Sequence, residues 1–123
     1  MAHAINWFEI PVKDLNRAKK FYETILGAKM DEMEAMGMKC AFFPADMMNG
    51  EIGGCLVLAE GYEPASNGAL IYLNGGDDLN IPLQKVENAG GKIILPKTSI
   101  GENGFMGHFI DTEGNKVAFH SMS

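Results

Sequence analysis

The stretch "HFIDTEGNKVAFHS", residues 108–121, brings together two histidines and two carboxylates. Such side chains bind metal ions or transfer protons, so the stretch has the residue types of a catalytic site. Its centre, "DTEGN" at 111–115, also has the residue types of a tight turn, because Asp accepts bonds from nearby backbone N–H groups and Gly or Asn tolerates positive φ. The distal Glu of an EF-hand calcium loop is missing. We therefore interpret "DTEGN" as a turn, His108 as a strand residue and His120 as the remaining catalytic candidate.

A second group of chemical candidates lies near the start of the chain, in "AINWFEIPV". Trp7 and Glu9 alternate along an expected strand and therefore share one face. A carboxylate beside an indole can act as a general base or hydrogen-bond a ligand, and Glu9 with His120 would make an acid/base pair if the first and last strands approach each other. Trp7 and Tyr72 suit the wall of a ligand pocket. The structural alternatives are a surface ion pair for Glu9, core packing for Trp7 and a hydrogen-bonded strand histidine for His120.

The composition limits the classes of function. The chain has 123 residues, of which 46 % are hydrophobic, and a formal net charge of −6. An acidic chain is poorly suited to neutralise phosphates, so we expect no nucleic-acid partner. No apolar run approaches the roughly 20 residues of a membrane span, and the N-terminus lacks the pattern of a signal peptide, so we expect a cytoplasmic protein with no membrane partner. Cys40 and Cys55 are too few for a disulfide framework and are expected to be free thiols.

The hydrophobic pattern predicts an alternation of strands and helices. A helix over 14–27 is indicated by Asp14 as its N-cap, an apolar stripe at helical spacing and Gly27 at its end. A second helix is expected over 77–91, with Asp78 or Asn80 as its cap, and a polar linker over 60–68. The strand candidates are 4–12, 28–34, 38–44, 53–59, 69–74, 92–96, 105–111 and 115–121.

The two halves of the chain therefore repeat one pattern, a strand and a helix followed by three strands. Asp-Leu opens both expected helices, and a glycine shortly before a lysine closes them. Two βαβββ modules would each leave one face of their sheet uncovered by a helix. We predict an α+β fold in which the modules form a curved, cup-like mixed sheet with the helices on its outer face.

The segments "FEIPVKDLNRAKKFYETILG" and "GHFIDTEGNKVAFHS" resemble the opening and closing signatures of the vicinal oxygen chelate superfamily, which includes glyoxalase I, bleomycin-resistance proteins and extradiol dioxygenases. The resemblance covers the whole chain. It implies a single domain over 1–123, with one module at about 1–60, a linker at about 60–68 and a second module at about 69–123. The fold hosts many activities, so the resemblance does not by itself identify one.

The resemblance also implies where metal ligands would stand, one on each of four strands. The first position here is Trp7 and the last is Ala118, neither of them a usual ligand. The fourth-strand position falls among residues 54–59, where only Cys55 can coordinate, and the fifth-strand position falls among residues 69–73, which offer no usual ligand. We therefore expect no cofactor and no conventional metal site, although a divalent ion held by other ligands stays open.

These observations lead to one main expectation and two alternatives. The main one is a glyoxalase-like protein that binds a small organic molecule in its cup without the usual divalent metal, through Trp7, Glu9, Tyr72 and His120. The first alternative is a lyase or isomerase of the glyoxalase type, metal-dependent or metal-free, with Glu9 and His120 as catalytic residues. The second is a non-catalytic protein that sequesters a drug or metabolite. The resemblance further implies a homodimer, for which the Met-rich region after the first helix is a candidate interface.

Overall fold

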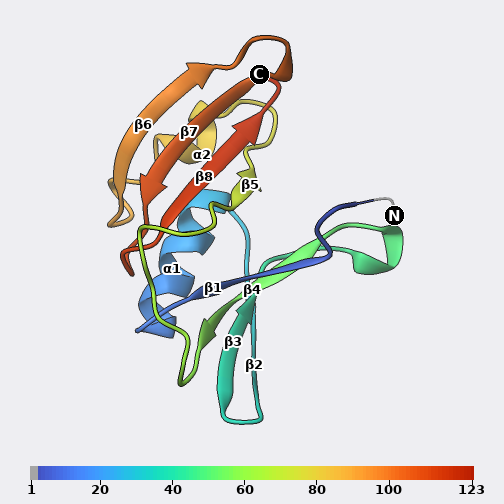
Figure 1. Cartoon of the computed structure of the whole chain (residues 1–123), viewed down its shortest axis with the longest axis vertical. Helices are drawn as coiled ribbons and strands as arrows, with labels where there is room; N and C mark the ends of the chain where they lie inside the picture. Colours follow the sequence, from blue (N-terminus) through green and yellow to red (C-terminus); the bar gives the residue numbers. More distant parts are fainter. Residues whose placement is uncertain (1–2) are drawn as a thin grey trace.

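The computed structural model describes residues 3–123 and contains two similar sets of strands (Figure 1). Its strands are β1 (Trp7–Pro11), β2 (Asp31–Ala35), β3 (Met38–Phe42), β4 (Gly53–Leu58), β5 (Tyr72–Asn74), β6 (Lys92–Ser99), β7 (Phe105–Ile110) and β8 (Lys116–Ser121). Its helices are α1 (Leu15–Leu26), α2 (Asn80–Leu83) and the 3₁₀ turns η1 (Met47–Asn49) and η2 (Gly101–Asn103). No helix within residues 3–123 combines the length and the apolar character that crossing a membrane requires.

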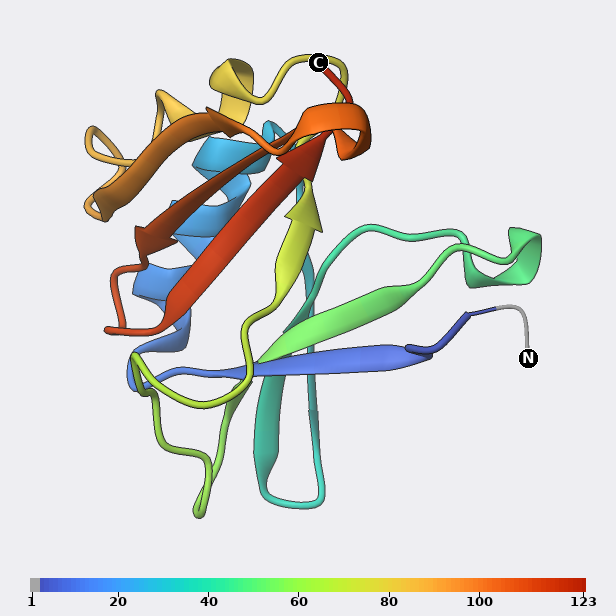
Figure 2. The same cartoon turned by 45° about the horizontal axis from the view of Figure 1, so that its top comes forward.

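The strands form two four-stranded sheets with the same internal order. One sheet has the order β1-β4-β3-β2 and the other β5-β8-β7-β6. In each module, the first strand along the chain pairs in parallel with the fourth, β1 with β4 and β5 with β8. The remaining pairs are antiparallel. The predicted α+β fold and repeated βαβββ pattern are therefore confirmed. Each module keeps its own sheet within the chain, so the two do not merge into one continuous curved sheet, and Figure 2 shows the sheets set at an angle.

Helix α1 joins the two sheets into one core. The Asp14 carboxylate accepts a hydrogen bond from the backbone N–H of Arg17, and Gly27 ends the helix in the left-handed region, as predicted. The buried face of the helix contacts both modules: Phe21 packs against Phe109 of β7 and Tyr22 against Phe43 after β3, with ring centroids 6.0 and 5.4 Å apart. Burial of each such aromatic side chain stabilises the fold by about 2 kcal/mol. Figure 2 shows α1 lying behind β7 and β8.

The second helix is much shorter than the sequence pattern suggested. The prediction of a helix over 77–91 is wrong in extent, because α2 covers only Asn80–Leu83 and the chain continues as turns to Gly90. After Pro82 several backbone bonds span three residues instead of four, as in the bond from the N–H of Lys85 to the carbonyl of Pro82. The pattern marked the apolar face correctly, but glycine and asparagine residues in its second half favour turns over a helix.

Several strands also differ from their predicted bounds. Strand β2 begins at Asp31 instead of residue 28, and β5 begins at Tyr72 instead of residue 69. The first strand was expected from residue 4 but begins at Trp7, whose partner Gly53 is the first residue of β4. The sixth strand was expected to end at residue 96 but continues to Ser99. Its pairing with β7 is irregular between Leu95 and Thr98, around Pro96, which is where a strand tolerates a residue without a backbone N–H.

Candidate functional site

The segment "DTEGN" is a turn between β7 and β8, as predicted. One oxygen of Asp111 accepts hydrogen bonds from the backbone N–H groups of Glu113 and Asn115 at 2.8 and 2.9 Å. Gly114 has φ of 92°, which an L-residue rarely adopts. Three polar side chains of the turn, Asp111, Glu113 and Asn115, are buried, which is unusual for a hairpin turn.

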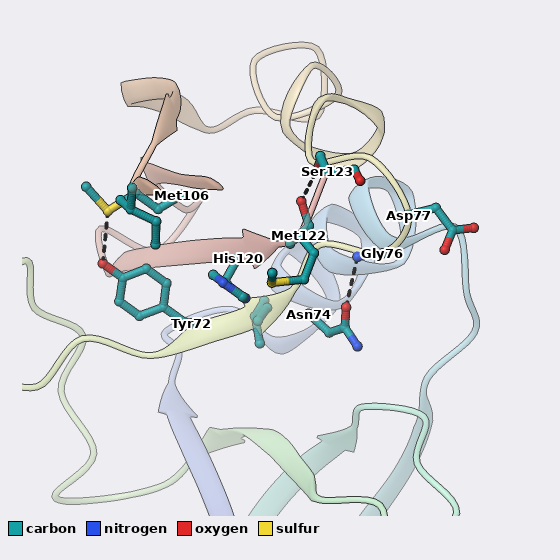
Figure 3. Close-up of a pocket in the computed structure, with 11 residues that line it drawn as sticks. Tyr72, Asn74, Gly76, Asp77, Met106, His120, Met122 and Ser123 are labelled. Atoms are coloured by element: carbon teal, nitrogen blue, oxygen red, sulfur yellow. Dashed lines mark hydrogen bonds between the residues drawn. The ribbon is translucent and has the colours of Figure 1, made fainter. Parts of the chain in front are cut away.

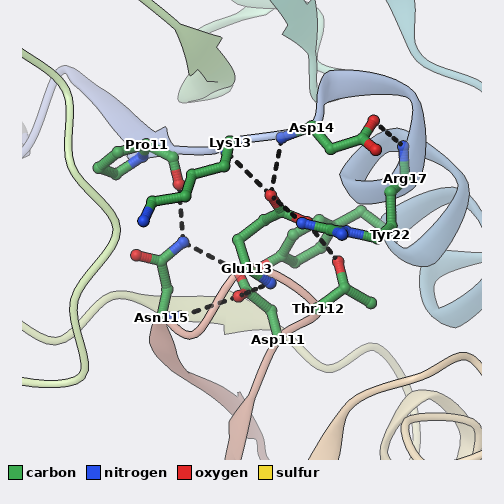
Figure 4. A network of polar contacts seen from close by, with 9 residues as sticks. All are labelled: Pro11, Lys13, Asp14, Arg17, Tyr22, Asp111, Thr112, Glu113 and Asn115. Atoms are coloured by element: carbon green, nitrogen blue, oxygen red, sulfur yellow. Dashed lines mark hydrogen bonds and ion pairs between the residues drawn. The ribbon is translucent and has the colours of Figure 1, made fainter.

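The buried Glu113 carboxylate connects this turn to the start of α1 (Figure 4). It accepts hydrogen bonds from the backbone N–H groups of Lys13 and Asp14 at 2.8 and 2.9 Å, and from Arg17 Nε at 2.7 Å. Burial alone would raise the pKa of Glu113, but the bonds from Arg17 and from these two backbone groups lower it to about 2. Glu113 is therefore a charged link between the modules, with its oxygens already in use.

Asp111 and Asn115 complete this network from the same turn. The Tyr22 hydroxyl of α1 donates to Asp111 at 2.7 Å, and the Asn115 amide donates to the carbonyl oxygen of Pro11 at 2.8 Å. Burial, followed by the charge of Asp111, raises the pKa of Tyr22 well above its ordinary value. Among residues 3–123 no buried side-chain nitrogen or oxygen lacks a hydrogen-bond partner. The network leaves no free group for a ligand, so its role is structural.

A cavity of about 750 Å³ lies on the face of β5, β8 and β7 opposite α1 (Figure 3). Two of the predicted ligand-binding residues, Tyr72 and His120, line it, because β5 and β8 run side by side and both side chains project to that face. Further polar groups come from Asn74 and Asp77. The apolar part of the wall is formed by side chains that sequence reasoning did not single out, Ile100, Met106 and Met122.

His108 was interpreted as an ordinary strand residue, yet it forms a specific contact beside this cavity. Its Nε2 lies 2.9 Å from the Tyr72 hydroxyl, and the two rings meet edge to face with centroids 5.6 Å apart. Burial lowers the pKa of His108, with Lys116 acting in the same direction, which favours the neutral imidazole. The register places Tyr72 and His108 on either side of Ala118. Met106 and His108 are two residues apart on β7, and Ala118 and His120 are two residues apart on β8. This spacing was the sequence signal that each pair lies on one face of its strand.

The other two predicted residues, Trp7 and Glu9, stand on the sheet of the first module. The Trp7 indole N–H donates to Glu9 at 3.3 Å, and the Tyr62 hydroxyl donates to the other oxygen of the same carboxylate at 3.1 Å. The Trp7 ring also lies 6.1 Å from that of Phe42 on β3, centroid to centroid. Tyr62 was hidden from sequence reasoning because it lies in the expected linker, where no periodicity assigns it a face.

Glu9 and His120 belong to different sheets of the chain. Glu9 is on β1, which pairs only with β4, whereas His120 is on β8, between β5 and β7. Their hydrogen-bond partners also differ, since His120 Nε2 lies 2.6 Å from the carbonyl oxygen of Asn103. The two strands are not paired with each other, although β1 and the start of β8 border one cleft, so the acid/base pair of Glu9 and His120 stays a prediction.

The residues at the positions of the superfamily's metal ligands do not form a suitable donor set. Trp7 and Ala118 offer no ligand atom, and Tyr72 of β5 is bonded to His108. Cys55 is buried, which together with the neighbouring Cys40 raises its pKa to about 12, and both cysteines are free thiols, as predicted. Within residues 3–123 no three His, Cys, Asp or Glu side chains are grouped so that they can hold a metal ion. This donor set does not fit a divalent ion, which needs three or four converging ligands.

The sequence of this chain matches a known protein superfamily. The sequence model of the Glyoxalase/Bleomycin resistance protein/Dioxygenase superfamily matches residues 4–119. The chain belongs to this superfamily. The resemblance seen in its opening and closing signatures is thereby confirmed.

Individual relatives agree with this membership. The chain is 32 % identical over 120 residues to a glyoxylase-like domain-containing protein of Didymella fabae, covering 93 % of this chain and 90 % of that protein. It is 28 % identical over 117 residues to CFP32 of Mycobacterium tuberculosis, named as a glyoxylase, and spans 91 % of itself but only 43 % of that longer protein.

Solved structures show the same fold. A mutant of glyoxalase I from Zea mays superimposes with a TM-score of 0.73 at 25 % identity, over 94 % of this chain and 45 % of the maize protein. The fosfomycin resistance protein FosX from Listeria monocytogenes gives a TM-score of 0.65 at 14 % identity, over 100 % of this chain and 93 % of the other. At 14 % identity the second match supports the fold alone.

Proposed function

We propose that this superfamily member binds a small organic molecule in the cavity on the β5-β8-β7-β6 sheet, without a divalent metal. The observation that carries the proposal is the cavity itself, which lies on the face that holds Tyr72 and His120. Its volume of about 750 Å³ is in the range of small-molecule sites. The superfamily membership and the glyoxylase names of relatives support a small-molecule function of this general kind.

The lining suggests how a ligand is held. Met106, Met122 and Ile100 offer apolar and adaptable walls for the body of the molecule. The Tyr72 hydroxyl and the Asn74 amide, both labelled in Figure 3, offer hydrogen bonds to a ligand in the cavity. A compact molecule with an apolar body and one or two uncharged oxygen or nitrogen groups satisfies both kinds of wall.

Thermal shift measurements with a library of such molecules test the proposal. A ligand at one hundred times its Kd stabilises a folded protein by about 2.7 kcal/mol, which a melting curve resolves. We expect the shift to disappear in Tyr72→Phe and His120→Ala and to persist in His3→Ala, a histidine control that lines a different surface hollow. Ligands that stabilise all three variants equally would place the binding site elsewhere, and no stabilisation by any of the library would count against the proposal.

Metal analysis is the second arm of this experiment. After dialysis we expect no stoichiometric divalent ion and no loss of ligand binding on addition of a chelator. A crystal soaked in zinc or nickel that shows one fully occupied ion among these side chains would overturn the metal-free part of the proposal.

A second candidate function is a metal-free lyase or isomerase, favoured by the hydrogen bond between Tyr72 and His108. A neutral imidazole bonded to a phenol can move a proton to or from a bound molecule. Turnover that is lost in His108→Asn while binding persists would support catalysis. Binding with no product in any variant would support sequestration instead.

We further propose that the protein works as a homodimer. Superfamily membership supports this assembly, and exposed methionines such as Met33 and Met36 on and beside β2 offer an adaptable contact surface. Light scattering at micromolar concentration is expected to give twice the mass of the 13.4 kDa chain, and a monomer mass would contradict it.

A further inference from the structure

The sheet of the first module carries a second group of side chains that the proposed function does not use. Trp7 and Glu9 lie on β1, Phe42 lies on β3, and Tyr62 reaches them from the segment after β4. The Trp7 side chain is 37 % exposed although it is a large hydrophobic residue. An exposed aromatic side chain beside a carboxylate offers both apolar contact and opposite charge to a cationic molecule.

The carboxylate of Glu9 is held in place by two neighbouring side chains. It accepts one hydrogen bond from the Trp7 indole and one from the Tyr62 hydroxyl, one on each oxygen. An ionised carboxylate has about four acceptor sites, so about two remain. None of the ion pairs found in residues 3–123 involves Glu9, although Lys116 and Glu9 both border a cleft between β1 and β8.

Two aromatic side chains, Trp7 and Tyr62, contact this carboxylate through their polar groups, and the Phe42 ring packs against Trp7. The Trp7 and Phe42 rings are inclined at 58° with centroids 6.1 Å apart, so they form two walls of a corner. The Tyr62 ring approaches from the other oxygen of Glu9, and the hydrogen bond to Glu9 raises the pKa of Tyr62, which keeps its hydroxyl protonated as a donor. Rings of this type attract cations to their faces, and Trp is the most effective of them.

We propose that Trp7, Phe42, Tyr62 and Glu9 form a binding site for a small organic ammonium ion. The rings supply apolar contact and cation–π attraction, and the Glu9 carboxylate supplies the opposite charge. A neutral molecule of the same shape gains only the apolar part, and an anion is repelled. The overall charge of −6 favours the approach of a cation. This site is on a different sheet from the cavity of the proposed function, so neither inference depends on the other.

The single tryptophan of the chain is a built-in reporter for this site. Choline is the probe, and dimethylbutanol, in which carbon replaces the quaternary nitrogen, is its uncharged isostere. We expect choline to change the Trp7 fluorescence in a saturable way, with an apparent affinity that falls as salt is raised. The isostere is expected to bind about tenfold more weakly, because it lacks the charge.

Variants separate the contribution of the Glu9 charge to choline binding from the contribution of the aromatic rings. Glu9→Gln keeps the shape of the side chain and is expected to weaken choline binding about tenfold. Glu60→Gln makes the same change of charge two residues from Tyr62, on an exposed side chain outside the cluster, and is expected to leave the affinity unchanged. Tyr62→Phe removes one bond that positions Glu9 and is expected to weaken binding about threefold.

Three results would overturn the proposal. They are the absence of a saturable fluorescence change with choline, equal binding of choline and its isostere, and an unchanged affinity in Glu9→Gln. Because Glu9 is exposed, this variant is expected to fold, and its melting curve provides the check. Failure of this site would leave the cavity beside Tyr72 and His120 untouched, since its test uses uncharged ligands.

Discussion

The C-terminal stretch supplies two regions of opposite character from the same residue types. In the turn at 111–115 the carboxylates and the amide are buried, and each is bonded to other parts of the chain. On the flanking strands, His108 and His120 lie at the open face of the sheet beside a cavity. The polar side chains of the turn are bonded within the protein, whereas the strand face borders a cavity that is open to another molecule.

The difference teaches that residue type alone does not distinguish a catalytic group from a structural one. Glu113 looks chemically more reactive in the sequence than Tyr72, but its oxygens are saturated by backbone and Arg17 donors. Tyr72 is exposed and lines a cavity. Burial and the number of bonds already formed decide between the two roles.

The largest expected effect is the loss of the Glu113 carboxylate. Glu113→Ala leaves the N–H groups of Lys13 and Asp14 without their acceptor and separates the turn from α1. We expect the free energy of unfolding to fall by about 3 kcal/mol, as measured in urea. Glu60→Ala, at an exposed position, should change it by less than about 0.5 kcal/mol. Similar losses in both variants would contradict the structural role of the turn.

Acid should remove the same contribution without a mutation. The pKa of Glu113 is about 2 in the folded protein, below its ordinary value of 4.5, so the carboxylate stabilises the fold above that ordinary value. The contribution, about 3 kcal/mol, is expected to be lost as the pH falls from about 4.5 through about 2. Urea unfolding at several pH values checks this, and Glu113→Gln should flatten the dependence. An equally steep dependence in that variant would assign it to other groups.

A smaller effect is expected from the buried bond between Tyr22 and Asp111. Tyr22→Phe removes the hydroxyl that donates at 2.7 Å, but Asp111 keeps bonds from Glu113 and Asn115. We expect a loss of about 1 kcal/mol in the free energy of unfolding. Thermal unfolding of Tyr22→Phe beside Tyr72→Phe compares the same chemical change at a buried and an exposed site.

The smallest effect on stability is expected at the cavity. Tyr72→Phe and His120→Ala should each change the free energy of unfolding by less than about 0.5 kcal/mol, because neither side chain is buried in the core. If the two regions differ as described, the cavity variants lose the stabilisation that a ligand provides, and the turn variants lose free energy of unfolding without a ligand. A large destabilisation by either cavity variant would show that its side chain has a structural role.

Much of the fold could be predicted from local patterns. Asp14 and Gly27 marked the ends of α1 because capping depends on groups within one turn of the helix. The turn at 111–115 followed from Asp and Gly in sequence. The second helix was overestimated because periodicity reports which residues face the core and does not report how long the backbone stays helical.

The candidate site could be predicted only in part. The sequence assigned Tyr72 and His120 to the wall of one ligand site, and both line the cavity. Tyr62 and His108 were missed because their roles depend on partners in other elements, Glu9 and Tyr72. The site residues Trp7, Glu9, Tyr72 and His120 remain predictions for ligand binding, which the titrations and thermal shifts above address.

By itself the sequence determined the superfamily, the repeated modules, the caps of α1 and the turn, since each is set by neighbouring residues. Only the tertiary structure decided that Glu113 holds the backbone of Lys13, 100 residues away, that Glu9 and His120 belong to separate sheets, and which side chains face the cavity. Such contacts arise from the packing of distant elements, and no local preference encodes which distant groups will meet.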